Sequence, residues 1–373
     1  MKRICVTTLM ICLLLLPPAV HAQGYISISE MNQQPPERWM QTYETPWRTI
    51  DIDVQPVVPV ADTLPILKVV PDFRPLDVSG LGEGWSRREA NERSTFGAYL
   101  NKDRSPRRES DNTTTTNYYP PFDMNTAYSK NNDMTLGDVI LHLRGIMTAM
   151  GEDREQWQYS QPNRIFINAT INLKTGEPMY ADSYTVFLNQ MLRGIPLLCH
   201  VLEGVAQPKD QEMISHTGLS FTITTPDLLS LGGKQVKVIS LLADDVPLCD
   251  FSKIKTAIEK QIQAGHVRKI FDVELGYALY NEPNIYRKPG AAWLQTAAFY
   301  AVPVWRVNCY YIEDAKGKLR DYTGTGVPQR AEIEYIALII NAQTGVVMDR
   351  DDNHKGCGDF TGFVSWEDVG GKP

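Results

Sequence analysis

The sequence lacks the features that would assign a function directly. It has no basic block, and its 37 Lys and Arg residues are outnumbered by 44 Asp and Glu residues, so nucleic-acid binding is not expected. Beyond the first residues, no apolar run approaches the roughly 20 residues that a membrane-spanning helix requires. With 43% hydrophobic and 22% charged residues, the composition is that of a globular protein rather than a disordered or fibrous one.

Catalytic signatures are also absent from the sequence. It contains no H-E-x-x-H zinc-protease motif, no G-x-S-x-G nucleophile elbow and no G-x-x-x-x-G-K-[ST] phosphate loop. Cys199 and His200 are adjacent, but neighbours on an extended strand point to opposite faces, and a nucleophile needs its base within hydrogen-bond distance. The sequence therefore predicts no catalytic residue, no cofactor and no metal site.

One acidic segment offers a weaker alternative. Asp349, Asp351 and Asn353 stand at the first, third and fifth positions of a calcium loop, but His354 and Phe360 occupy the places of its glycine and glutamate. A solvated acidic turn is the preferred interpretation, and a calcium-stabilised surface protein is the alternative.

The first 22 residues have the pattern of a secretory signal peptide. Lys2 and Arg3 form a charged start, Leu9 to Leu16 an apolar middle, and Val20-His21-Ala22 an acceptable cleavage site. An uncleaved anchor is the alternative, but the short apolar run and the helix-stopping Pro17-Pro18 favour cleavage. We therefore predict a secreted or extracytoplasmic protein without a membrane span after signal removal.

Export changes the interpretation of the cysteines. The mature chain keeps four of them, Cys199, Cys249, Cys309 and Cys357, and an even number in an oxidising compartment predicts two disulfides. The preferred pairing is Cys309–Cys357 with Cys199–Cys249, each closing a loop of roughly 50 residues, which in the chain-entropy model contributes about 4 kcal/mol. Both other pairings remain open, as do unpaired buried thiols.

Proline is distributed unevenly along the mature chain. Residues 23–133 hold 11 prolines, as many as the 240 residues from 134 to 373. The first segment is therefore predicted to be extended, with short strands such as Ile50 to Val54, where apolar residues alternate with aspartates. Residues 82–119 are polar and charged, which predicts a mobile surface loop.

Two similar units are predicted from residue 134 onward. In the first, 134–248, Thr135 caps a helix and alternating strands follow; in the second, 249–373, Ser252 caps a helix before further strands. The motif I-N-x-x-T-G occurs at 171–176 and again at 340–345. We therefore predict an α+β fold, in which helices pack on antiparallel sheets in two related helix-plus-sheet units.

Several stretches together carry a family resemblance. E-R-W at 37–39 leads to the strand at 49–54 and to L-P-I at 64–66, while V-P-V-W-R-V at 302–307 precedes Y-I-A-L-I-I-N-A-Q-T-G at 335–345. The chain thus resembles an uncharacterised family of secreted or lipid-anchored proteins from gut Firmicutes, and its C-terminal part is similar to YycH/YycI-type regulators and PepSY-like modules. The resemblance implies a helix on an antiparallel sheet and no established enzyme activity. In the regulators, such domains modulate a membrane sensor kinase through protein contacts.

These observations together favour an exported, non-catalytic binding or regulatory protein that acts through contacts with a protein or the cell envelope. A secreted hydrolase with a site built from distant carboxylates is the principal alternative, because such a site leaves no short motif.

Overall fold

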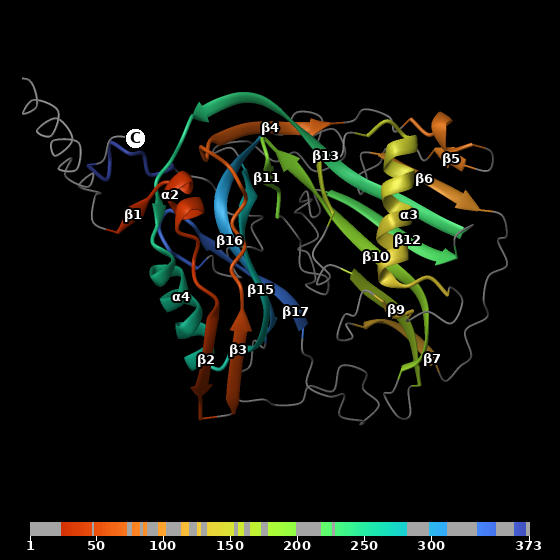
Figure 1. Ribbon diagram of the computed structural model, residues 1–373, viewed down its shortest axis with the longest axis horizontal. Coiled ribbons are helices and arrows are strands. Elements are labelled where there is room, and N and C mark those ends of the chain that lie inside the picture. Colours follow the sequence, from red (N-terminus) through yellow and green to blue (C-terminus); the bar gives the residue numbers. More distant parts are fainter. Residues whose placement is uncertain are drawn as a thin grey trace, which may run out of the picture.

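The computed structural model shows a protein built mainly from strands (Figure 1). It describes residues 24–46, 48–72, 77–82, 85–87, 96–101, 113–118, 125–127, 133–152, 156–159, 165–172, 178–198, 218–225, 228–281, 298–311, 334–347 and 362–370. Within these ranges lie seventeen strands but three α-helices. The prediction of an α+β fold is therefore wrong: long strands, pairing between distant parts of the chain, supply most of the regular structure.

Thirteen strands form one antiparallel sheet. Its main path runs β15-β16-β4-β13-β12-β10-β9-β7; in addition β17 pairs with β16, β6 with β13, β5 with β6, and both β8 and β11 with β10. The bounds are β4 (Ile66–Asp72), β5 (Trp85–Arg87), β6 (Phe96–Asn101), β7 (Thr113–Tyr118), β8 (Trp157–Tyr159), β9 (Ile165–Asn172), β10 (Pro178–Leu192), β11 (Ile195–Pro196), β12 (Gly218–Thr225), β13 (Leu228–Ala243), β15 (Val267–Asn281), β16 (Phe299–Tyr311) and β17 (Glu334–Asn341).

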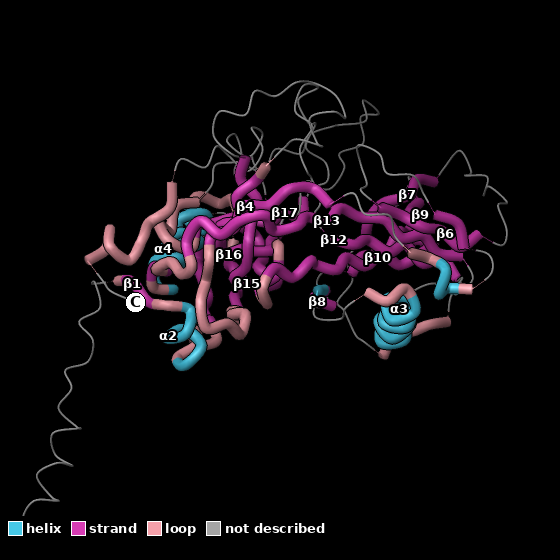
Figure 2. The backbone as a smooth tube through the Cα atoms, turned by 90° about the horizontal axis from the view of Figure 1, so that it is seen from above, coloured by secondary structure: helices cyan, strands magenta, loops and turns pink. Residues whose placement is uncertain are grey.

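The remaining elements are short. β1 (Tyr25–Ile26) pairs with β14 (Leu248–Cys249), and β2 (Trp39–Glu44) pairs with β3 (Thr49–Val54). The helices are α2 (Ile28–Gln33), α3 (Leu136–Ala149) and α4 (Phe251–Gln263). Seen from above, α3 and α4 lie at different halves of the long sheet (Figure 2).

The helix boundaries follow local hydrogen-bond chemistry. Thr135 caps α3 as predicted, and Asp138 completes a capping box by accepting a hydrogen bond from the Thr135 backbone. The prediction of Ser252 as the cap of α4 is wrong, because Asp250 is the N-cap and its carboxylate accepts from the Ser252 backbone N–H. Gly265 follows the end of α4 with φ +82°, as expected of a helix-terminating glycine.

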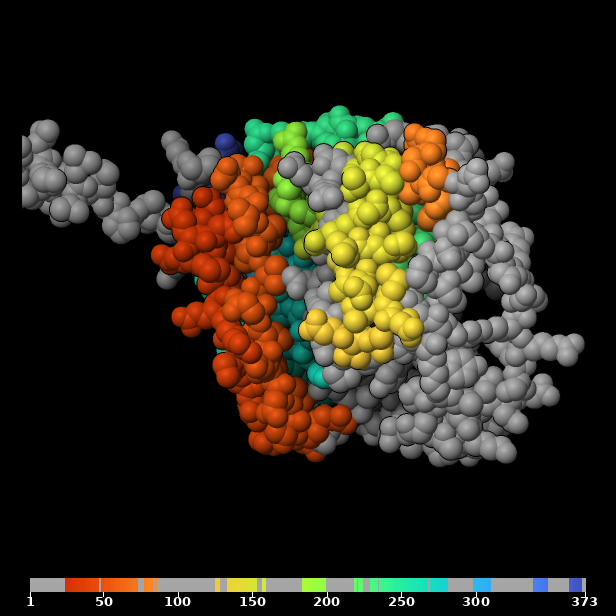
Figure 3. All heavy atoms as spheres, turned by 45° about the vertical axis from the view of Figure 1, so that its right-hand side comes forward, coloured from red at the N-terminus to blue at the C-terminus, as the bar shows by residue number. Residues whose placement is uncertain are grey.

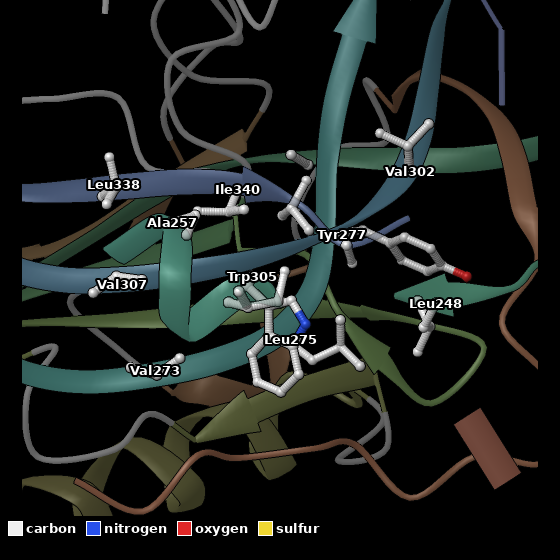
Figure 4. Close-up of a cluster of buried hydrophobic side chains, with 14 of the residues drawn as sticks. Leu248, Ala257, Val273, Leu275, Tyr277, Val302, Trp305, Val307, Leu338 and Ile340 are labelled. Carbon is white, nitrogen blue, oxygen red and sulfur yellow. The ribbon is translucent and has the colours of Figure 1, made fainter. Parts of the chain in front are cut away.

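Each of these two helices covers a separate hydrophobic core. Beneath α3, apolar side chains of β10, β12 and β13 surround Leu136 and Leu143. Beneath α4 lies a larger core, centred on β15, β16 and β17 (Figure 4). Strand β13 belongs to both cores, since Leu231 packs in the first and Val236 in the second. One long strand therefore joins the two halves.

The N-terminal segment packs into the α4 core. Ile50, Ile52 and Val54 of β3 are buried and the aspartates between them are exposed, which confirms the predicted strand. The hairpin of β2 and β3 is held against α4 where the Tyr43 hydroxyl donates to the Glu259 carboxylate at 2.5 Å. Burial of the ring, together with this hydrogen bond, raises the pKa of Tyr43 well above its usual range.

Residues 82–119 do not form one continuous loop. Their described parts are the strands β5, β6 and β7, which pair with β6, β13 and β9 and so extend the sheet. The mobility predicted for residues 82–119 stays a prediction.

The repeated turn motif is described at its second copy. There the Asn341 side chain accepts hydrogen bonds from the backbone of Gln343 and Thr344, and Gly345 has φ +71°. The Gln343 side chain reaches further and bonds both the N–H and the carbonyl of Val364, which attaches the C-terminal segment. Of the first copy, residues 173–176 lie outside the described residues.

Candidate functional site

The structure describes two of the four cysteines predicted to form disulfides. Cys249 ends β14 and Cys309 lies in β16, and both side chains are buried. Cys199 and Cys357 lie outside the described residues, so the pairings Cys309–Cys357 and Cys199–Cys249 stay predictions.

Burial raises the pKa of the Cys249 thiol to about 11 and that of the Cys309 thiol to about 12. At pH 8 roughly one thousandth or less of either would be thiolate. We therefore expect iodoacetamide to label neither in the native protein at pH 8, and labelling of Cys249 to increase first as the pH approaches 11. Peptide mass spectrometry after labelling measures this, with labelling in guanidinium as the positive control.

The labelling experiment also tests the state of the two buried cysteines. Rapid modification in the native state would contradict the buried, protonated state. Resistance to iodoacetamide even in guanidinium, lost on reduction, would show that a thiol is held in a disulfide with a cysteine outside the described residues.

Other sites considered from the sequence receive no structural support. The acidic segment 349–353 lies outside the described residues. Among the residues that the structure does describe, no group of three or more His, Cys, Asp or Glu side chains could hold a metal ion. No described helix is both long enough and apolar enough to cross a membrane.

A buried polar network, which the sequence analysis missed, lies between the two cores. Glu274 in β15 stands opposite Arg306 in β16, and the two fully enclosed side chains form an ion pair with 3.0 Å between Nη2 and Oε2. Gln158 of β8 donates to the other Glu274 carboxylate oxygen at 2.7 Å, and Asn189 of β10 donates to Gln158 at 2.6 Å. The network therefore ties β15 and β16 to the half of the sheet that carries α3.

The next pair along the same strands continues this polar face. Asn308 donates to the Asp272 carboxylate at 2.6 Å, and both side chains are buried. The alternate positions, such as Trp305 and Leu275, point into the α4 core instead (Figure 4). The sequence does contain a signal for this network: Asp272 and Glu274 alternate with apolar residues in β15, as Arg306 and Asn308 do in β16. The signal can be recognised only once the register of the two strands is known.

The geometry of the network is suited to holding the two halves of the sheet together rather than to catalysis. Its carboxylates are enclosed and held by amide and guanidinium donors. The backbone segments also approach each other closely beside the network. A Cβ on Gly276 would lie 2.4 Å from the Pro196 carbonyl oxygen, so only glycine permits this close approach of β15 to β11. We interpret the network as the joint between the two halves.

The surface feature with binding character is the C-terminal half of β13 together with Asp244, the residue that follows it. We call residues 237–244, together with their outward side chains, the β13 edge. This strand runs along the top of the molecule in Figures 1 and 3. Its large apolar side chains are exposed, with fractions of 37% for Val238, 50% for Ile239, 37% for Leu241 and 39% for Leu242.

Backbone pairing differs between the two sides of the β13 edge. Residues 235–243 pair with β4, whereas the pairing with β12 ends at Lys234 and that with β6 at Gly233. Among the described strands, therefore, none pairs with the second side of this half. The Gln190 side chain bonds both the N–H and the carbonyl of Val236, just before the exposed residues begin.

Charges stand at the two ends of the β13 edge. Lys237 and Asp244 are both exposed, and neither forms an ion pair with another described residue. The adjacent Asp245 is engaged instead, since it accepts hydrogen bonds from the Leu64 backbone and the Trp366 indole. The edge is thus an apolar strip with a cation at its start and an anion at its end.

Comparison with known proteins assigns no family. No protein-family model and no curated protein matches the chain. Among solved structures, it is similar to an uncharacterized protein from Eubacterium rectale ATCC 33656, with 11% identity and a TM-score of 0.46 over 88% of this chain and 96% of that chain. A similarity at this level carries no functional argument, so the resemblance to secreted proteins stays a prediction.

Proposed function

We propose that this protein is an exported, non-catalytic binding or regulatory protein that acts through protein contacts, and that the β13 edge is its contact surface. The observation that carries the proposal is the exposed strand half whose four large apolar residues face solvent beside a backbone edge that no described strand pairs with. Neighbouring exposed apolar residues of this kind are uncommon away from interaction sites.

The mode of contact follows from the backbone. An edge strand offers a row of N–H and C=O groups, to which an extended segment of another protein can add as a further strand. Main-chain hydrogen bonds then supply affinity, while contacts with Ile239 and its apolar neighbours supply selectivity. Two irregularities in the pairing with β4, at Ile239 and at Leu242, make the edge distinctive in shape.

Site-specific photo-crosslinking tests the proposal. A benzoylphenylalanine at Ser240, which is exposed in the middle of the edge, should form protein adducts in the native host. The same group at Thr256, exposed on α4, is the control and should form few. Addition of Ile239→Lys to the Ser240 probe should remove the adducts, because a charge would be placed in the apolar contact.

The outcomes separate the alternatives. Adducts at Ser240 that Ile239→Lys abolishes support binding through this edge, whether the captured protein is this chain or another. Equal yields at Ser240 and Thr256, or none at either, contradict the proposal. The hydrolase alternative would be supported if the protein turned over a hydrolase probe or a glycan and if substitution of a single carboxylate abolished that turnover.

The export part of the proposal needs a separate measurement. If residues 1–22 are a cleaved signal peptide, then N-terminal sequencing of protein from the native host should begin at Gln23 and the protein should leave the cytoplasm. A retained Met1 in cell-associated protein would contradict it.

A further inference from the structure

We infer that the occupant of the β13 edge is a flexible segment of another protein that binds in extended form. Along its chain it carries a basic residue, then a stretch of alternating apolar and polar residues, then an acidic residue. This inference rests on the proposed function, because it names the chemistry of the partner for the same surface. Three properties of the edge lead to it: the two faces of its strand, its irregular pairing and its charges.

One face of the edge is the margin of the α4 core. Val238 lies opposite Val69 and Leu241 opposite Leu67, and side chains that are directly opposed across two strands share a face of the sheet. Val69 and Leu67 are fully buried in the α4 core, whereas Val238 and Leu241 are each 37% exposed. Apolar side chains of an added strand would cover these two residues and extend the core layer by one strand.

The other face of the edge is polar. Ser240 lies opposite Lys68; Ser240 is exposed and Lys68 is half-buried. Successive side chains of a strand point to opposite faces, so a strand added beside this half of β13 presents every second residue to the polar face. The segment that fits is therefore one in which apolar and polar residues alternate.

The irregular pairing of β13 restricts the occupant to a flexible segment. The register with β4 shifts twice, so that Ile239 and Leu242 have no β4 partner. Such irregularities bend and twist an edge, which hinders pairing with the straight edge strand of a folded sheet. A tail or linker that becomes ordered only on binding can follow the bend.

The charges of the edge give the segment its direction. Lys237 and Asp244 are exposed, and neither has an ion pair within the described part of the chain. All described neighbours of β13 pair with it antiparallel, and antiparallel pairing is slightly the more stable per residue. An antiparallel segment passes Asp244 first and Lys237 last. A basic residue before the alternating stretch and an acidic residue after it would therefore meet opposite charges at both ends.

Selection from a displayed peptide library tests the inference. Each peptide holds an alternating apolar and polar stretch of about six residues, the usual length of a strand, and its two flanking positions are lysine or glutamate in every combination. Selection on the immobilised mature chain should enrich the order lysine, stretch, glutamate over the reverse order by about tenfold, because reversal makes both end contacts repulsive.

Variants of the edge show whether the selected peptides bind there. The double variant Lys237→Asp with Asp244→Lys should reverse the preferred order, because the two charges of the edge are exchanged. Lys260→Asp, the same change of charge at an exposed position of α4, is the matched control and should leave the preference as it is. Ile239→Lys should abolish enrichment of every order, while circular dichroism shows an unchanged fold, because the Ile239 side chain is half exposed.

A preference that reverses with the double variant supports the inference. It would be overturned by a library without enriched peptides, by enrichment without an order of charges, by enrichment of the reverse order on the wild-type chain, or by a preference that the double variant leaves unchanged.

The inference and the proposed function can fail separately. Protein adducts at Ser240 that Ile239→Lys abolishes, together with a library that shows no order of charges, overturn this partner chemistry and leave binding through the edge supported. Capture of a second copy of this chain at Ser240 has the same meaning. An edge that yields neither adducts nor enriched peptides contradicts both.

Discussion

Replacement of Glu274 by glutamine is expected to lower the free energy of unfolding by about 3–5 kcal/mol, because it leaves the buried guanidinium of Arg306 without a counter-charge. Both side chains are enclosed between the two halves of the sheet, so water cannot compensate the loss. Chemical denaturation followed by circular dichroism measures the change.

Two further variants separate the buried charge from the loss of a contact. Replacing Glu274 and Arg306 together by methionine should recover a large part of the lost stability, since paired removal leaves no isolated charge. The exposed ion pair between Arg38 and Asp53, at 2.6 Å, is the matched control. Asp53→Asn should change the midpoint little, because solvent screens that pair. Equal effects of Glu274→Gln and Asp53→Asn would contradict the role assigned to the network.

Replacement of Trp305 by alanine is the second change with a large expected effect, a loss of about 3–5 kcal/mol in the free energy of unfolding. The indole is fully buried beneath α4 (Figure 4), and its ring centroid lies 4.9 Å from that of Phe251. Its removal would leave a cavity at the point where α4 contacts β16. Denaturation by guanidinium, followed by the far-ultraviolet signal, measures the loss.

Trp305→Phe is the control for this variant. The indole Nε1 has no hydrogen-bond partner among the described residues, so phenylalanine would lose ring volume but no hydrogen bond. Its cost should therefore be well below that of alanine. A phenylalanine variant as unstable as the alanine variant would show that the indole N–H has a partner and that packing alone does not explain the residue.

Local features of the fold could be predicted because they depend on near neighbours in the sequence. The capping box of Thr135 and Asp138 spans four residues, and the alternation in β3 and the turn at Asn341 span six or fewer. Their hydrogen bonds and buried faces follow from residue type and spacing. The cap of α4 was predicted two residues too late, because Asp250 and Ser252 are both good capping residues.

The fold class and the candidate surface could not be predicted in the same way. The run V-I-S-L-L at 238–242 has no alternation, which is typical of a strand buried on both faces, yet the structure exposes it. Exposure depends on whether other segments of the chain pack against the two faces of the strand, and the run itself does not encode that. The buried pair of Glu274 and Arg306 likewise depends on the register of two long strands.

The sequence by itself determined the strand and helix segments with short-range signals, the turn chemistry and the absence of known catalytic motifs. Tertiary structure alone decided that β4, near the N-terminus, lies between β13 and β16, and that one sheet joins both cores. The physical reason is that strand pairing between distant segments is chosen by the burial and hydrogen bonding of the whole sheet. That choice also determines along which residues of β13 no described strand pairs with the second side.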